Sequence, residues 1–271
     1  MKTKRKITFI IILVFSLISS ICIPSIKPFY NQAMNRKFIE NVERNALTAN
    51  IEIVQLKYTT NGNSSSIAVS VGASGVIIAR EGNKYFALTA NHVISELDDV
   101  DKTEILVMGY DDLDYNDTLN MPGEIKGVAN YYKQFPHSVV EYSNVKYDLA
   151  LISFISDEVY TVLSLAEDIP KYGDKVASMS NPYGKRNIVT AGKISSKKLW
   201  SFNDEAGKTQ YQNIKHSAVI SEGSSGSALL NENLEIVGIN LGGNENIFHK
   251  FISGMAMPND RIRAFLEEWK N

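Results

Sequence analysis

Short apolar runs separated by turn residues fill most of the chain beyond residue 50, and this pattern constrains the fold more than any other feature. The runs are rich in Val, Ile, Phe and Tyr and are bounded by Gly, Asn, Pro and Asp, as β-strands are. They cover residues 67–71, 75–79, 85–90, 104–108, 149–154, 174–178, 188–194, 227–230 and 235–241. Short strands at this spacing are typical of sandwiches and barrels and not of a parallel sheet with helical crossovers. We therefore predict an all-β domain over residues 51–271.

Two segments within this domain depart from the strand pattern. Residues 109–146 carry few strand signals, so we expect them to leave the core. Near the C-terminus the apolar side chains fall at helical spacing, at Ile262, Phe265, Leu266 and Trp269. One apolar face of this kind predicts a terminal helix, which Asn259 or Asp260 would cap.

The first 26 residues have the character of a targeting segment. A basic leader over residues 1–6 precedes an uncharged apolar run over residues 7–26, which is about long enough to cross a bilayer as a helix. Basic residues before such a span stay in the cytoplasm. We expect an uncleaved signal anchor that holds the domain outside the cell membrane of a bacterium. The alternatives are a cleaved signal peptide, which would give a secreted protein, and lipid attachment at Cys22.

Residues 27–50 form a separate segment. Apolar side chains recur every four residues from Tyr30 to Ala46, which predicts an amphipathic linker helix. We expect its apolar face to pack on the domain or on a neighbouring chain, with contact to a membrane surface as the alternative.

Composition removes several classes of function. The net charge of −2 gives no basic field for nucleic acid, and a single cysteine, Cys22, allows neither an internal disulfide nor a cysteine metal cage. The acidic residues between 98 and 117 lack the ligand spacing of a calcium loop, so we expect a solvated surface there and no metal. No cofactor is implied, and the oligomeric state stays open.

Three short motifs gain meaning from their order. His92 follows the apolar run 85–90, Asp148 opens the run 149–154, and Ser225 lies in the turn Gly223-Ser224-Ser225-Gly226. Acyl transfer by serine needs a base, a carboxylate that orients the base, and N–H donors for the oxyanion. We predict His92, Asp148 and Ser225 as catalytic residues, and the backbone N–H groups of Gly223 and Ser225 as the oxyanion hole. The order His, Asp, Ser disfavours an α/β-hydrolase, in which the serine comes first.

With these motifs the chain resembles the trypsin-like serine peptidases, and within them the bacterial HtrA-type proteases and staphylococcal glutamyl endopeptidases. The matching segments are residues 72–77, 88–93, 147–150, 181–184, 223–227 and 236–240. The resemblance runs from about Ser66 to the C-terminus and implies two antiparallel six-stranded β-barrels followed by a helix. It also implies a cleft between the barrels, with His92 and Asp148 supplied by the first and Ser225 by the second. HtrA-type proteases carry PDZ domains after the protease; because the sequence ends at Asn271, we expect none.

The resemblance also locates a substrate pocket, formed by Val219, Ile220, Asn240, Leu241 and Gly242. Asn240 stands where the glutamyl endopeptidases have a histidine, and Ile220 stands where they have a threonine. We therefore expect a small or medium apolar side chain, and not glutamate, before the cleaved bond. Lys185 and Arg186 are expected to be solvated, and His216 to be structural or to line the cleft.

The sequence as a whole predicts a serine endopeptidase that cleaves protein or peptide substrates through an acyl-enzyme on Ser225. Two alternatives share the same fold. One is a catalytically idle module that holds a partner, and the other is an enzyme that acts on esters.

Overall fold

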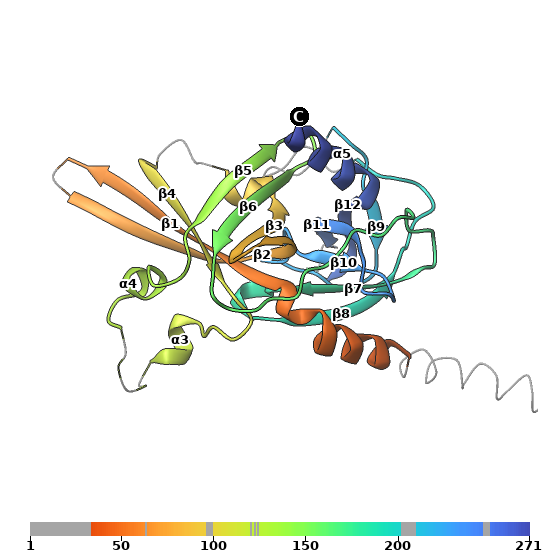
Figure 1. The fold of residues 1–271 in the computed structure, drawn as a ribbon. Helices are drawn as coiled ribbons and strands as arrows, with labels where there is room; N and C mark the ends of the chain where they lie inside the picture. Colours follow the sequence, from red (N-terminus) through yellow and green to blue (C-terminus); the bar gives the residue numbers. More distant parts are fainter. Residues whose placement is uncertain are drawn as a thin grey trace, which may run out of the picture.

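The computed structural model describes residues 34–271 except 63, 96–99, 120, 122, 124, 202–209 and 246–249. Two antiparallel sheets of six strands each make up the body (Figure 1). The first sheet contains β1 (Asn50–Asn61), β2 (Ser64–Glu81), β3 (Lys84–Ala90), β4 (Lys102–Met108), β5 (Ser138–Asn144) and β6 (Leu149–Ile155). The second contains β7 (Lys175–Ser180), β8 (Ile188–Lys193), β9 (Ile214–His216), β10 (Ala228–Leu230), β11 (Ile236–Glu245) and β12 (Phe251–Pro258).

Both sheets curl until their outer strands approach each other. The first has the order β4-β1-β2-β3-β6-β5, and a bridge between Leu106 and His137 joins its two ends. The second has the order β8-β7-β10-β11-β12-β9, and Ile194 bridges His216. The two antiparallel six-stranded β-barrels expected from the resemblance are present as two curled half-barrels, and a C-terminal helix follows them as predicted.

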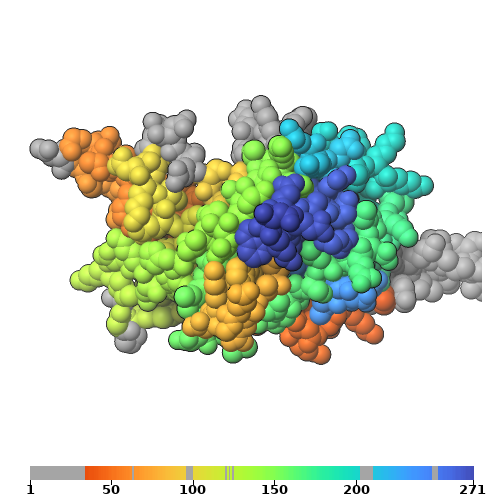
Figure 2. Space-filling model, turned by 45° about the horizontal axis from the view of Figure 1, so that its top comes forward, coloured from red at the N-terminus to blue at the C-terminus, as the bar shows by residue number. Residues whose placement is uncertain are grey.

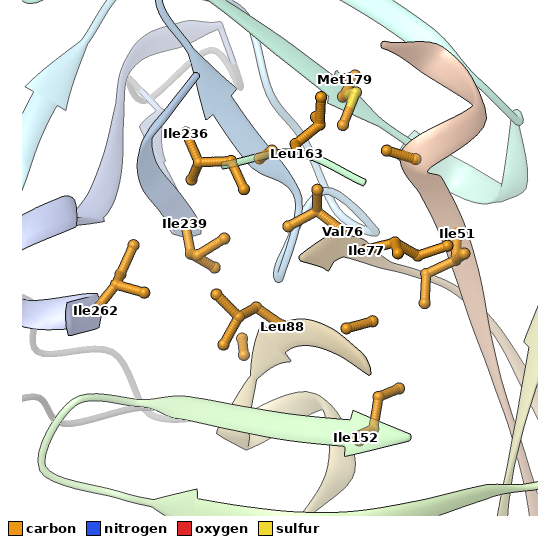
Figure 3. Close-up of a cluster of buried hydrophobic side chains, with 14 of the residues drawn as sticks. Ile51, Val76, Ile77, Leu88, Ile152, Leu163, Met179, Ile236, Ile239 and Ile262 are labelled. Atoms are coloured by element: carbon orange, nitrogen blue, oxygen red, sulfur yellow. The ribbon is translucent and has the colours of Figure 1, made fainter. Parts of the chain in front are cut away.

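A shared apolar core lies between the half-barrels. Figure 3 shows Val76, Leu88 and Ile152 from the first sheet facing Ile236 and Ile239 from the second, and all five are fully buried. Burial of side chains this large is the main favourable term in folding. The core therefore fixes the relative positions of the loops that carry the predicted catalytic residues.

The segment before β1 folds onto this body. Residues 34–45 are helical and continue into a short 3-10 helix, η1 (Leu47–Ala49), so the predicted amphipathic helix is present over its described part. Phe38, Val42 and Ala46 are buried in the main core cluster, while the opposite face is exposed. In Figure 1 the helix runs beneath β7 and β8.

The excursion predicted after β4 contains two short helices, α3 (Tyr115–Thr118) and α4 (Val128–Tyr132). A separate apolar cluster lies beside the long β1–β2 hairpin. It contains Tyr131, Tyr132 and Phe135 together with Leu56 and Leu106. The part of this segment before β5 lies outside the main core, as expected, and covers one side of the projecting hairpin (Figure 1). Residues 138–144 were also expected to leave the core, and this is wrong, because they form β5 and pair with β6 in the first sheet.

The terminal helix is α5 (Asn259–Lys270), which packs on β5 through Phe265 and Tyr142 and buries Ile262 and Phe265 as predicted. It is the dark blue part of the surface in Figure 2. The prediction that Asn259 or Asp260 caps it is wrong, because no side-chain cap bond is made at its start. The Asn259 amide instead donates to the carbonyl oxygens of Ala166 and Asp168, at 2.6 and 2.9 Å, and so ties the helix start to the chain before β7.

Among the helices of the described residues, none combines the length and the apolar character needed to span a bilayer. The span predicted at residues 7–26, and the signal segment 1–26 as a whole, lie outside those residues.

Candidate active site

His92 and Asp148 meet where β3 ends and β6 begins. β3 runs antiparallel to β6 with Ala90 opposite Leu149, so the residues just beyond this pair are neighbours. His92 lies in the short helix α2 (Asn91–Ile94). Asp148 Oδ2 lies 2.7 Å from His92 Nδ1, and Asp148 Oδ1 accepts the His92 backbone N–H at 2.8 Å. One carboxylate therefore fixes both the backbone and the ring of the histidine.

The burial and backbone conformation of Asp148 suit a carboxylate that holds His92 in place. The residue is only 1% exposed and has a φ of 53°, a left-handed conformation that is uncommon for residues other than glycine. Its carbonyl oxygen also accepts the N–H of Asn91. Strained backbone of this kind persists only where neighbouring contacts hold it, and it is concentrated at functional sites.

Ser225 lies in the loop between β9 and β10, and that loop packs directly against the first half-barrel. Its carbonyl oxygen accepts the N–H of Ser74 at 3.0 Å. Gly226 has a φ of 85°, and a Cβ there would overlap the Ser74 carbonyl oxygen and the Thr89 hydroxyl. Only glycine permits this approach, which brings Ser225 next to the end of β3 and therefore to His92.

Gly223 is held in the same way on the other side of Ser225. Its carbonyl oxygen accepts the Ser74 hydroxyl at 2.8 Å, and a Cβ on it would overlap the Gly72 carbonyl oxygen. The preceding carbonyl, that of Glu222, accepts the N–H of Tyr183 at 2.8 Å. The C=O and N–H of a trans peptide point in opposite directions, so the Gly223 N–H is directed away from Tyr183.

A hollow of about 290 Å³ brings these groups together, because His92, Gly223 and Ser225 all line it. The Ser225 hydroxyl donates to the Leu241 carbonyl oxygen at 3.2 Å. It must rotate from that bond toward His92 before it can transfer a proton, and a change between staggered rotamers permits this. The opposite wall of the hollow comes from the β1–β2 hairpin, including Gln55, Lys57 and Val71, which sequence reasoning did not identify.

The five residues expected to form a substrate pocket lie outside the lining of this hollow. Val219 is 52% exposed, whereas Ile220 and Leu241 are buried. The Asn240 side chain points into the second sheet, where its amide donates to Ser178 and Ser227 at 2.9 and 2.8 Å. Asn240 is therefore a buried polar link between strands in this structure.

Arg186 corrects one expectation. It was expected to be solvated together with Lys185, but only 10% of its side chain is exposed. Its guanidinium donates to the fully buried Glu52 carboxylate at 2.8 Å and to the Gly109 carbonyl oxygen. Lys185 is exposed, as expected. A basic residue in a polar loop gives no sequence signal of such burial, because its partner lies far away in the chain.

Two other histidines and the acidic residues complete the survey of candidate ligands. His216 is fully buried in β9, which agrees with a structural role, and burial lowers its pKa to about 4. His137 is exposed. Within the described ranges, no group of three His, Cys, Asp or Glu side chains is arranged to hold a metal ion.

Comparison with known proteins identifies relatives. The chain is 27% identical over 216 residues to the serine protease Do-like HtrA of Bacillus subtilis, covering 78% of this chain and 42% of that protein. It is 34% identical over 124 residues to the periplasmic serine endoprotease DegP of Salmonella typhimurium, covering 43% of this chain and 24% of that protein. The chain thus spans less than half the length of these relatives.

A solved structure has a similar fold, and a family model identifies the family of the chain. An HtrA-type protease with a tripeptide superposes with a TM-score of 0.58 at 23% identity, covering 84% of this chain and 62% of that one. The family model described as a trypsin-like peptidase domain matches residues 73–239, which include His92, Asp148 and Ser225. The chain therefore belongs to the family of trypsin-like peptidase domains.

Proposed function

We propose that this protein is a serine endopeptidase that hydrolyses peptide bonds through an acyl-enzyme on Ser225. The observation that carries the proposal is the position of His92, which Asp148 holds by two hydrogen bonds while its ring lines the same hollow as Ser225 and Gly223. The naming of the relatives as serine proteases supports the same conclusion.

In this mechanism His92 takes the proton from the Ser225 hydroxyl as that oxygen attacks the scissile carbonyl. Asp148 keeps the proton of His92 on Nδ1, so that Nε2 is free to act as the base. His92 then gives its proton to the leaving amine, and water repeats the sequence to release the acyl group. Charge that develops on the carbonyl oxygen is stabilised by the N–H groups of Gly223 and Ser225.

The location and the preferred substrate belong to the same proposal. The DegP relative from Salmonella typhimurium is named as periplasmic, which supports action outside the cytoplasm. We propose that residues 7–26 anchor the protein in the cell membrane, with cleavage and secretion as the alternative. Val219, Ile220, Leu241 and Gly242 are the proposed walls of a pocket for a small or medium apolar side chain.

The test is digestion of a mixed peptide library by the full-length protein in detergent, with the products identified by mass spectrometry. We expect cleavage after small or medium apolar residues and no cleavage by Ser225→Ala. Ser196→Ala is the matched control, because among the described residues the hydroxyl of this serine bonds within residues 196–200, far from Ser225 in sequence. Equal cleavage by the wild type and Ser225→Ala would exclude the proposed nucleophile.

A further inference from the structure

The direction of one oxyanion donor depends on the loop at residues 181–187, which includes the 3-10 turn η2 (Pro182–Gly184). Tyr183 in this turn holds the Glu222 carbonyl oxygen and thereby sets the direction of the Gly223 N–H. If the Glu222 peptide rotated, its carbonyl oxygen and the Gly223 N–H would exchange directions. The loop must therefore stay in place for the proposed oxyanion hole to form.

The loop does not hold this conformation by local preference. Tyr183 has a φ of 53°, in the left-handed region that a bulky side chain with a Cβ disfavours. Tyr183 is 65% exposed, so its side chain is not packed into the body. Contacts from other parts of the chain must hold the loop.

Arg186 supplies such a contact across the two half-barrels. It reaches from the loop to Glu52 on β1 and to the Gly109 carbonyl oxygen just beyond β4. The Glu52 carboxylate also lies near the backbone of Gly72, which lowers its pKa, and Gly72 lies against Gly223. The pair therefore touches the oxyanion segment from two sides, through Tyr183 and through Gly72.

A buried ion pair is weak evidence for a contribution to stability, because desolvation offsets much of the attraction between the charges. Burial raises the pKa of Glu52 to about 7, the Arg186 charge opposes this rise, and Asp114 adds to it. Asp114 and Asp112 face the same guanidinium, and burial raises the pKa of each carboxyl. The role of the Glu52–Arg186 pair is therefore better sought in the position that it gives to the loop at residues 181–187 than in stability.

We propose that Glu52 and Arg186 are positioning residues, which fix the loop at residues 181–187 and through Tyr183 keep the Gly223 N–H directed at the oxyanion. This inference rests on the proposed function. Neither Glu52 nor Arg186 is proposed as a catalytic residue, because neither lines the hollow that Ser225 lines.

The kinetic test compares the wild type with Arg186→Met, Glu52→Gln and the double variant, using a peptide substrate identified by the library. Loss of one oxyanion donor lowers kcat by about 10²–10³. We expect each single variant to lower kcat by roughly 10- to 100-fold while KM changes by less than about two-fold, since the donor acts chiefly in the transition state. Lys185→Met is the matched control, because it removes a charge from the same loop at an exposed position.

The double variant separates positioning from stability. Removing both charges relieves the unpaired buried ion that each single variant leaves, so the double variant should recover Tm. It still lacks the link to the loop, so its kcat should stay low. Recovery of kcat together with Tm would show that the pair is merely structural and would overturn the proposal.

Hydrogen exchange of the amides at residues 221–225 tests the coupling without any need for activity. We expect faster exchange in Arg186→Met and in the double variant, and wild-type exchange in Lys185→Met. Unchanged exchange in all variants would overturn the positioning role, whether or not the wild type cleaves peptides. A wild type that cleaves nothing would count against the proposed function alone, since the exchange result would still decide the coupling.

Discussion

The contact between His92 and Asp148 shows at the scale of single residues how the structure prepares a base. Both carboxylate oxygens are engaged, one by the ring and one by the backbone N–H of the same histidine. Because a buried carboxylate can only accept hydrogen bonds when ionised, Nδ1 must carry the proton. The ring is thereby fixed in the tautomer that the proposed mechanism requires.

Asp148→Asn tests this reading of the tautomer. The amide keeps the shape of the side chain but can donate a hydrogen bond to Nδ1, which moves the ring proton to Nε2. We expect kcat to fall by roughly 10⁴ with little change in Tm, as in the equivalent substitution in this kind of triad. Peptide hydrolysis measured beside a thermal melt checks the prediction, and a fall of less than ten-fold in kcat would contradict it.

Gly226 allows a second prediction at this scale. A Cβ at Gly226 meets backbone and side-chain atoms of the first half-barrel, whereas Gly82, which also has a positive φ, has open space around it. Gly82→Ala should cost only the backbone strain, about 1–2 kcal/mol. Gly226→Ala adds overpacking of about 1–3 kcal/mol and should be clearly less stable in urea unfolding. Equal losses in the two variants would show that the close approach is unimportant.

The helix at residues 34–45 is part of the folded body. Its apolar face contributes Phe38 and Val42 to the main core, so the body of the protein includes residues that precede the first strand. Sequence periodicity predicted this helix and its buried face, because an amphipathic repeat is a local signal.

Strands with buried polar residues were harder to predict. β1 was not recognised, because Glu52 and Gln55 are buried within it and interrupt the apolar pattern. β2 was read as two runs, since Gly72-Ala73-Ser74 separates them, yet the strand is continuous and the pairing with β1 shifts register between Ile53 and Gln55. The ion pair between Glu52 and Arg186 joins residues that are far apart in the chain, so no local sequence pattern predicts it.

Phe38→Ala tests whether this helix is part of the folded body. Phe38 is 5% exposed, so its truncation removes packed surface and leaves a cavity that costs about 3–5 kcal/mol. Arg44→Ala, on the exposed face, is the control and should change stability by less than about 0.5 kcal/mol. Urea unfolding of the full-length chain gives both values. Similar stability of the two variants would mean that the helix does not pack as the structure shows.

The whole molecule is two half-barrels that share a main apolar core, with the proposed catalytic residues contributed from both. Residues far apart in the chain come together because Ser74 in the first half bonds to Ser225 and packs against Gly226 in the second. The three motifs and the family resemblance that they carry predicted this arrangement. The sequence also led to the family and to the sheet content. It did not predict the hairpin wall of the hollow, because its members share no motif.

Acid should destabilise the whole fold through His216 in β9. Burial lowers the pKa of His216 to about 4, whereas the unfolded chain binds the proton near pH 6.5. The unfolded state therefore binds more protons between these values, and stability falls as the pH drops from 6.5 to 4, by on the order of 3 kcal/mol. His216→Gln should lack this part of the pH dependence. Exposed His137→Gln is the control and should retain it; a wild-type slope in His216→Gln would contradict the account.

Covalent labelling of the full-length protein with a fluorophosphonate probe tests whether Ser225 is an activated nucleophile. Such probes react with a serine only where a base and oxyanion donors activate it. The account predicts one adduct by intact mass, located at Ser225 by peptide mapping, none on Ser225→Ala, and strongly slowed labelling of His92→Ala. No adduct on folded wild-type protein, or labelling that persists in Ser225→Ala, would contradict the assignment of Ser225 as an activated nucleophile.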